Sequence, residues 1–133
     1  MHVIALGMLG STNTIWRNDI ENSRLLPIKE FKYSLQEFAV SVWNGKTMIL
    51  TGGQNDLTGS ARKKAVTYDF MIKDNLLKIQ TKKIAELEEK RMKHSMVVVR
   101  GIVLVFFGFK DVRDHCSETA EYLDLEASQD TFH

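Results

Sequence analysis

An internal repeat constrains this chain more than any other feature of its sequence. Three residues recur after 56 positions: Phe38, Gly45 and Gly52 are matched by His94, Gly101 and Gly108. Two recur after 55 positions: Asp69 and Leu77 are matched by Asp124 and Phe132. One deletion in the loop before Asp124 accounts for the change of spacing. A period of about fifty residues predicts small units that stack on one another, as in propellers.

Short runs of β-branched and aromatic residues, separated by glycine, predict strands within each unit. Residues 39–43 and 47–51 flank Asn44-Gly45, and residues 96–99 and 102–107 flank Arg100-Gly101. Asn and Gly readily adopt the positive φ of a two-residue turn, so each pair predicts an antiparallel hairpin. A third strand is expected at 65–70 and 120–125. A fourth is expected at 76–79 and near Phe132.

The strands divide the chain into three units: residues 1–35, 36–84 and 85–133. The first unit is incomplete, because residues 3–6 resemble a second strand and residues 14–17 a third. Residues 81–93 leave an alternative open, since Ile84, Leu87 and Met92 have roughly helical spacing. The matching region 30–37 has no helical pattern, which favours a non-helical connection.

The composition is that of one soluble globular domain. The 133 residues are 44% hydrophobic, and 18 basic against 17 acidic side chains leave a formal net charge of +1. The apolar runs are far shorter than the ~20 residues of a membrane span, and a secretory signal is lacking, so we expect an intracellular protein. The near-neutral charge disfavours a nucleic-acid binder. Cys116 is the only cysteine, which excludes an internal disulfide.

The ordered features resemble the Kelch repeat. In the last unit they are Arg91, His94, Ser95, Gly101, Phe107-Gly108, Glu121, Tyr122, Asp124 and Phe132. In the preceding unit they are Gly45, Gly52-Gly53, Tyr68-Asp69, Asn75 and Leu77. Two departures are that the preceding unit has no Arg-x-x-His at its start and that both late tryptophans are replaced. A tryptophan-aspartate repeat fits the period less well.

The resemblance implies an all-β fold: four-stranded antiparallel blades of a Kelch-type β-propeller, forming a partial ring. Known Kelch propellers usually have five to seven blades. An apolar sheet face would therefore stay uncovered at each end of this chain, and we expect missing blades or other subunits to complete the propeller. The resemblance also implies that His94 hydrogen-bonds backbone between blades. Tyr68 and Tyr122 are expected to be equivalent, packed core residues.

No catalytic, metal or cofactor site is expected. Asp111, Asp114, His115 and Cys116 are of types that bind zinc, but they lack a second cysteine pair and a His-x-x-x-His spacing. The loop from Gly52 to Ser60 departs from the spacing of a phosphate-binding loop. Ser95 and His94 are adjacent along a strand and point to opposite faces, so they form no dyad.

The expected function is a non-enzymatic protein-interaction scaffold. The alternatives are the substrate-recognition part of a ubiquitin-ligase adaptor and a fragment of a propeller enzyme. Antiparallel blades bring the loops after second strands and the connections after fourth strands to one rim, which is where we expect protein partners to bind. The candidate contact residues are Gln54, Asn55, Asp56, Arg62, Lys63, Lys64, Lys110, Asp111, Arg113 and Asp114.

Overall fold

The computed structural model describes residues 4–9, 12–19, 21–30, 35–55, 59–74, 76–111, 113, 115–127 and 132–133, and these contain strands and no helix. The strands are β1 (Ile4–Leu9), β2 (Thr12–Asp19), β3 (Arg24–Glu30), β4 (Leu35–Gln36), β5 (Ala39–Trp43), β6 (Thr47–Thr51), β7 (Gln54–Asn55), β8 (Ala65–Lys73), β9 (Leu76–Lys83), β10 (Ser95–Val99), β11 (Ile102–Phe106) and β12 (Ala120–Asp124).

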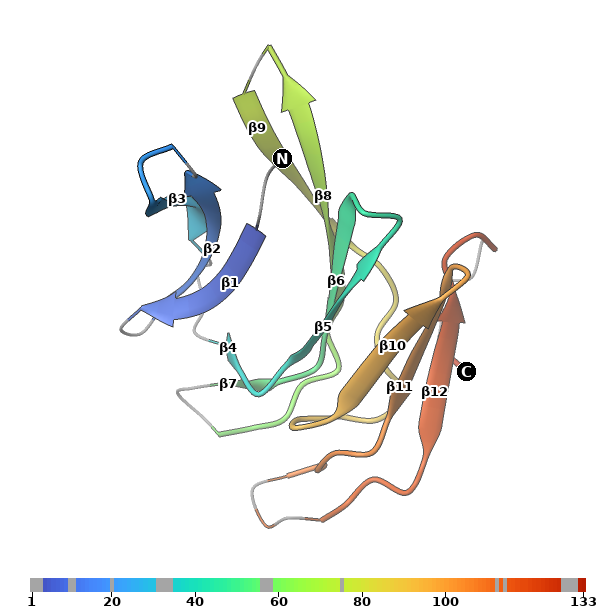
Figure 1. The fold of residues 1–133 in the computed structure, drawn as a ribbon. Coiled ribbons are helices and arrows are strands. Elements are labelled where there is room, and N and C mark those ends of the chain that lie inside the picture. Colours follow the sequence, from blue (N-terminus) through green and yellow to red (C-terminus); the bar gives the residue numbers. More distant parts are fainter. Residues whose placement is uncertain are drawn as a thin grey trace.

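Three antiparallel sheets follow one another along the chain. Their strand orders are β1-β2-β3, β5-β6-β8-β9 and β10-β11-β12, and β4 and β7 form a short two-stranded sheet. Within each of these three sheets, every strand pairs with the strand of the same sheet that follows it along the chain. Figure 1 shows the four-stranded sheet in the middle, with β1–β3 on one side and β10–β12 on the other. The three sheets do not close into a ring within the described residues.

Both predicted hairpins are confirmed, and they differ in turn length. Val99 pairs with Ile102, which leaves a turn of two residues, as expected. Trp43 pairs with Thr47, so the other turn contains three residues. Asn44 and Gly45 have φ values of 49° and 71°, in the left-handed region that Asn and Gly occupy at the lowest cost.

Because of this difference in turn length, the repeat offset changes at the hairpin turn and not in the later loop. The offset between corresponding strand starts is one position smaller for β6 and β11, and for β8 and β12, than for β5 and β10. The expected deletion in the later loop is therefore wrong, because the extra residue lies in the turn at 44–46. Gly52 consequently corresponds to Phe107, and Gly53 to Gly108. Their φ values agree: 61° and 98° in one unit, 60° and 90° in the other.

The match of Leu77 with Phe132 is also wrong. No strand follows β12 among the described residues, so the fourth strand expected near Phe132 is not found, but His133 exchanges backbone hydrogen bonds of 2.6 and 2.9 Å with Tyr122. Tyr122 corresponds to Thr67, which pairs with Lys82, so His133 takes the place of Lys82. The β8–β9 hairpin is longer than its counterpart. Residues 81–83 belong to β9, and residues 84–94 are not helical, which removes the helical alternative.

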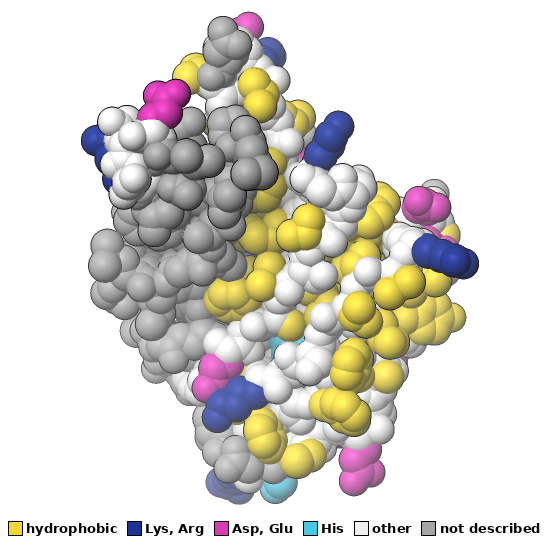
Figure 2. All heavy atoms as spheres, in the orientation of Figure 1, with side chains coloured by type: hydrophobic (Ala, Val, Ile, Leu, Met, Phe, Trp, Pro, Cys, Tyr) yellow, Lys and Arg dark blue, Asp and Glu magenta, His cyan; other side chains and the backbone are white. Residues whose placement is uncertain are grey.

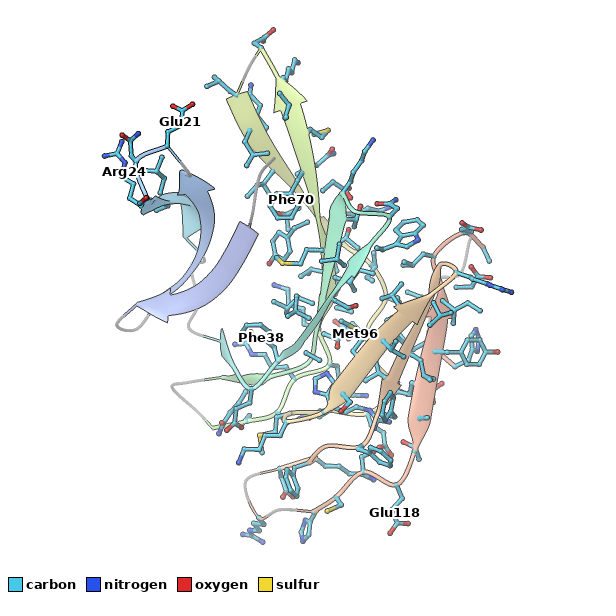
Figure 3. All side chains as sticks on the ribbon, viewed as in Figure 1. Glu21, Arg24, Phe38, Phe70, Met96 and Glu118 are labelled. Atoms are coloured by element: carbon cyan, nitrogen blue, oxygen red, sulfur yellow. The ribbon has the colours of Figure 1, made fainter. Side chains whose placement is uncertain are left out.

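The main core lies between the four-stranded sheet and β10–β12. Alternating residues of β10, β11 and β12 point toward the four-stranded sheet. The side chain of Met96, on β10, lies between this strand and β5 (Figure 3). The connection after β9 contributes Ala85 and Leu87, and the C-terminal segment contributes Phe132. The buried members are Ile49, Ala65, Ala85, Leu87, Val103, Val105, Leu123 and Phe132.

A second cluster covers the opposite face of the four-stranded sheet. It consists of Met48, Leu50, Val66 and Tyr68, with Phe38, Phe70 and Ile79 packed against it. Phe38 and Phe70 both extend toward the side on which β1 lies in Figure 3. Tyr68 is only 5% exposed, and burial raises its pKa to about 12. Strand β6 is buried on both faces, which explains the three consecutive apolar residues at its centre, 48–50.

Tyr122 does not have this environment. It is 47% exposed on the face of β12 that points away from the four-stranded sheet. The prediction that Tyr68 and Tyr122 are equivalent core residues is therefore wrong. Leu123 is the counterpart of Tyr68, and it is buried between the two sheets. A shift of one residue along a strand moves a side chain to the other face, which is why the two tyrosines have different surroundings.

Replacing each tyrosine by alanine distinguishes these environments. Tyr68→Ala is expected to lower the free energy of unfolding by about 3–5 kcal/mol, because it leaves a cavity in a packed cluster. Tyr122→Ala should cost about 1 kcal/mol, since its ring already contacts solvent. Denaturant unfolding followed by circular dichroism measures both changes. Equal losses would contradict the difference in burial.

Candidate interaction surface

The predicted loops lie at one edge of the sheets. Leu87 N, in the connection after β9, donates to Lys63 O in the loop after β6 at 2.8 Å. The next loop is joined to this connection through Lys110, whose Nζ lies 3.1 Å from Glu89 Oε1. Figure 1 shows the turns at 44–46 and 100–101 at the other end of the strands. We call the edge that carries the described residues of 52–64, 84–94 and 107–119 the loop rim.

The segment Arg91–His94 joins two sheets through its backbone. Gly53 N donates to Arg91 O at 2.8 Å, and Arg91 N donates to Arg62 O at 3.1 Å. The next residue, Met92, exchanges hydrogen bonds of 3.0 and 2.9 Å with Phe109 in the following loop. The backbone between the two sheets is therefore paired on both sides, and this pairing fixes where each loop begins.

Glycine permits this close approach. A Cβ added at Gly52 would lie 2.5 Å from both Arg91 O and His94 Cε1. At Gly108 it would lie 2.6 Å from His94 Cβ and 2.7 Å from Met92 O. Such distances are well inside van der Waals contact, and a backbone carbonyl cannot rotate away as a side chain can. Both positions therefore require glycine.

Two glycine substitutions separate steric overlap from backbone strain. Gly108→Ala and Gly45→Ala both place alanine at positive φ, which costs about 1–2 kcal/mol. No atom of the described part of the chain lies within 4 Å of a Cβ at Gly45. We expect Gly108→Ala to lower the free energy of unfolding by roughly 2 kcal/mol more than Gly45→Ala, measured by denaturant unfolding. Similar values would mean that the close approach carries no energetic weight.

His94 lies at the centre of the junction. Its Nε2 is 2.9 Å from Thr51 Oγ1 of the preceding sheet, so the bond between sheets reaches a side chain rather than the expected backbone. Its Nδ1 is buried and has no hydrogen-bond partner among the described residues. The pKa of His94 is lowered to about 4, because burial disfavours the imidazolium and the Arg91 guanidinium repels it. At neutral pH the ring is therefore uncharged.

This lowered pKa predicts an acid-sensitive junction. The unfolded chain binds a proton at His94 near pH 6.5, whereas the folded chain binds it only near pH 4. Stability is therefore fully present above pH 6.5 and is lost as the pH falls toward 4, by about 3 kcal/mol.

His94→Gln should remove this loss, measured as the free energy of unfolding at pH 7, 5.5 and 4. Glu89 does not obscure it, since the pKa of Glu89 falls from 4.5 to about 2 and its contribution is lost mainly below pH 4.5. An unchanged slope in His94→Gln would contradict the prediction.

Arg91 organises the loop after β11 from inside the molecule. Its side chain is fully buried, and its Nε donates to Glu121 Oε2 at 2.8 Å. Nη1 donates to Phe107 O at 3.0 Å, to Ser117 Oγ at 2.7 Å and to Thr119 O at 2.9 Å, and Nη2 donates to Thr119 Oγ1 at 2.6 Å. One guanidinium thus holds both ends of residues 107–119.

Two carboxylates complete this cluster. Glu121, which is buried on β12, also accepts hydrogen bonds from the backbone N of Glu88 and of Glu89. Glu89 accepts from Ser117 Oγ at 2.7 Å and from Thr119 Oγ1 at 3.0 Å. The Ser117 bond, with further help from Lys110, lowers the pKa of Glu89 to about 2. The connection after β9 is therefore attached to the next loop by ionised groups.

Breaking the buried pair should be costly. Arg91→Met leaves the Glu121 carboxylate buried without its partner and is expected to lower the free energy of unfolding by about 3–5 kcal/mol. Arg91→Met with Glu121→Met should recover part of this loss. The control is Lys83→Met, which removes the exposed pair with Glu86 and should cost less than about 1 kcal/mol. Equal costs at positions 91 and 83 would contradict the role of the buried network.

The predicted contact residues of the first loop differ in exposure. Lys64 is exposed, whereas Arg62 and Lys63 are half-buried. Gln54 is half-buried, and its Nε2 donates to Gly59 O at 3.0 Å, which closes the start of the loop on itself. Asn55 lies on β7 and pairs with Leu35. Asp56 lies outside the described residues.

The second loop carries an exposed acid and histidine pair. Asp111 Oδ2 lies 2.8 Å from His115 Nδ1, and Asp111 Oδ1 accepts from Arg113 N at 2.9 Å. Asp114 lies outside the described residues. The described part of the chain contains no group of three metal-ligating side chains, and Cys116 is exposed. Lys110, Asp111 and Arg113 lie in this loop, and Lys110 is tied to the neighbouring connection through Glu89.

The sequence analysis missed Glu89, Ser117 and Thr119. Each lies in a loop, where hydroxyl and carboxyl side chains are common, so composition alone does not single them out. One signal was available, namely that Arg91 and Glu121 lie next to or within apolar strands. A guanidinium that is buried there has more donors than one carboxylate can satisfy, so it needs further acceptors nearby.

No family model matches the chain, and no curated protein matches it. Among the described residues, no helix is long and apolar enough to cross a membrane.

Proposed function

We propose that the chain is part of a Kelch-type β-propeller and that its sheets are blades. Support comes from two meander sheets whose strands recur at a nearly constant offset along the chain and which pack face to face. The Gly52-Gly53 pair and the Arg91 and His94 positions, which carry the resemblance to the Kelch repeat, meet at the contact between these sheets. A propeller places successive sheets in this way around an axis.

The proposed role is a non-enzymatic scaffold for protein partners. The observation that carries it is the loop rim, where loops from two sheets are fixed by Arg91 and Glu89 while charged side chains of the same loops stay exposed. Loops held on a rigid support are a common means of recognition. The exposed charges, among them Lys64 and Arg113, suit a polar partner surface.

The last sheet also needs a partner. Exposed apolar side chains cover the outer face of β10–β12, and Figure 2 shows hydrophobic side chains gathered over this sheet. We infer that another β-sheet, from missing blades or from another subunit, covers it. This cover would complete the propeller on which the loop rim is carried.

Charge reversal tests the loop rim. The triple substitution Arg62→Glu, Lys63→Glu, Lys64→Glu is expected to weaken partner association at least tenfold and to change its salt dependence, with the fold intact by circular dichroism. The control alters Asn44 and Arg100 in the turns at the opposite edge. Pull-down or mass photometry measures both variants, and a loss confined to the turn variant would place the interface on the other edge.

A further inference from the structure

The outer face of β10–β12 is apolar and uncharged over most of its area. Strand register places Val97, Leu104 and Tyr122 side by side, with Val99 and Ile102 beside them toward the turn. These five side chains are between 37% and 57% exposed. The outer face therefore resembles the apolar surface that the four-stranded sheet presents to β10–β12. A further sheet could pack on it in the same way.

One residue distinguishes this face from the junction within the chain. Gly52 directly follows β6, and its missing side chain leaves the space that Arg91 O and the His94 ring occupy. The corresponding residue after β11 is Phe107, which has a φ of 60° and is 66% exposed. Its ring meets the Phe106 ring edge to face, with the centroids 5.1 Å apart. Phe106 shares the outer face with Leu104.

A side chain at this place is incompatible with the junction seen at Gly52. A Cβ alone would lie 2.5 Å from a backbone carbonyl and from an imidazole of the arriving sheet. Phe107 adds a whole ring in the same direction, so a segment like Arg91–His94 cannot pass there. Phenylalanine at positive φ also costs free energy, and such strain is concentrated at sites with a specific role.

We propose that Phe107 determines which sheet docks on the outer face of β10–β12. It excludes a further unit that arrives with a segment like Arg91–His94. It leaves the face to an apolar β-sheet that approaches without such a segment. This inference rests on the proposed function, in which another sheet covers the face.

A tandem chain tests the exclusion. Because His133 takes the place of Lys82, a second copy of residues 83–133 appended after His133 continues the repeat in register. A single thiol at position 104 of the first copy, made by Leu104→Cys with Cys116→Ser in both copies, reports whether the face is covered. The rate of maleimide labelling is compared with that of the 133-residue chain, with Phe107 or Phe107→Gly in the first copy.

With Phe107 present, the appended unit should leave the labelling rate within twofold of that of the single chain. With Phe107→Gly, the appended unit should slow labelling at least tenfold. Equal protection in both tandem chains would overturn the inference and leave the proposed cover intact. No protection in either would overturn both.

The reciprocal substitution tests the same idea at the existing junction. Gly52→Phe should make a thiol at the buried position 103 accessible, with labelling at least tenfold faster than in the parent chain. Gly45→Phe places the same residue at positive φ in open space and should leave that rate unchanged. If Gly52→Phe does not fold, the tandem pair decides. A rate unchanged by Gly52→Phe would count against the inference.

Discussion

The described structure depends on a short stretch of backbone that is hydrogen-bonded to two sheets at once. Arg91 O accepts from Gly53 N on one side, and Met92 pairs with Phe109 on the other. These bonds bring the sheets so close that a Cβ at Gly52 or Gly108 has no room. Polar backbone groups that are buried must be paired, so the spacing of the sheets is set by hydrogen bonding as much as by apolar packing.

Side chains extend this constraint to the loops. The Arg91 guanidinium is out of reach of solvent, and a lone buried cation would be severely destabilising. Glu121 supplies the compensating charge, and hydroxyls and carbonyls of residues 107–119 satisfy the remaining donors. The network holds the two ends of this loop, at Phe107 and at Ser117 and Thr119. The loop rim is thus ordered by a group that no partner would touch.

Much of the fold could be predicted, because alternation and glycine turns are local signals. The hairpins around Gly45 and Gly101 follow from them directly. The residue-by-residue match between the repeats was predicted less accurately. One extra residue in the turn at 44–46 leaves the apolar pattern of each strand unchanged, but it shifts the match of every later residue by one position. The exposure of Tyr122 could not be read from the sequence. It depends on which face of β12 has a neighbour, and an apolar side chain looks the same in either case.

The loop rim and the outer face of the last sheet are built from different residues, apart from Phe107. Residues 107–119 are held by Arg91 and Glu89 from the side of the preceding sheet, whereas the outer face consists of Val97, Leu104, Tyr122 and their neighbours on β10–β12. Phe107 lies between the two, with its carbonyl bound to Arg91 and its ring against Phe106. Phe107 is thus the residue that the loop rim and the outer face share, and a change at this position acts on both surfaces at once.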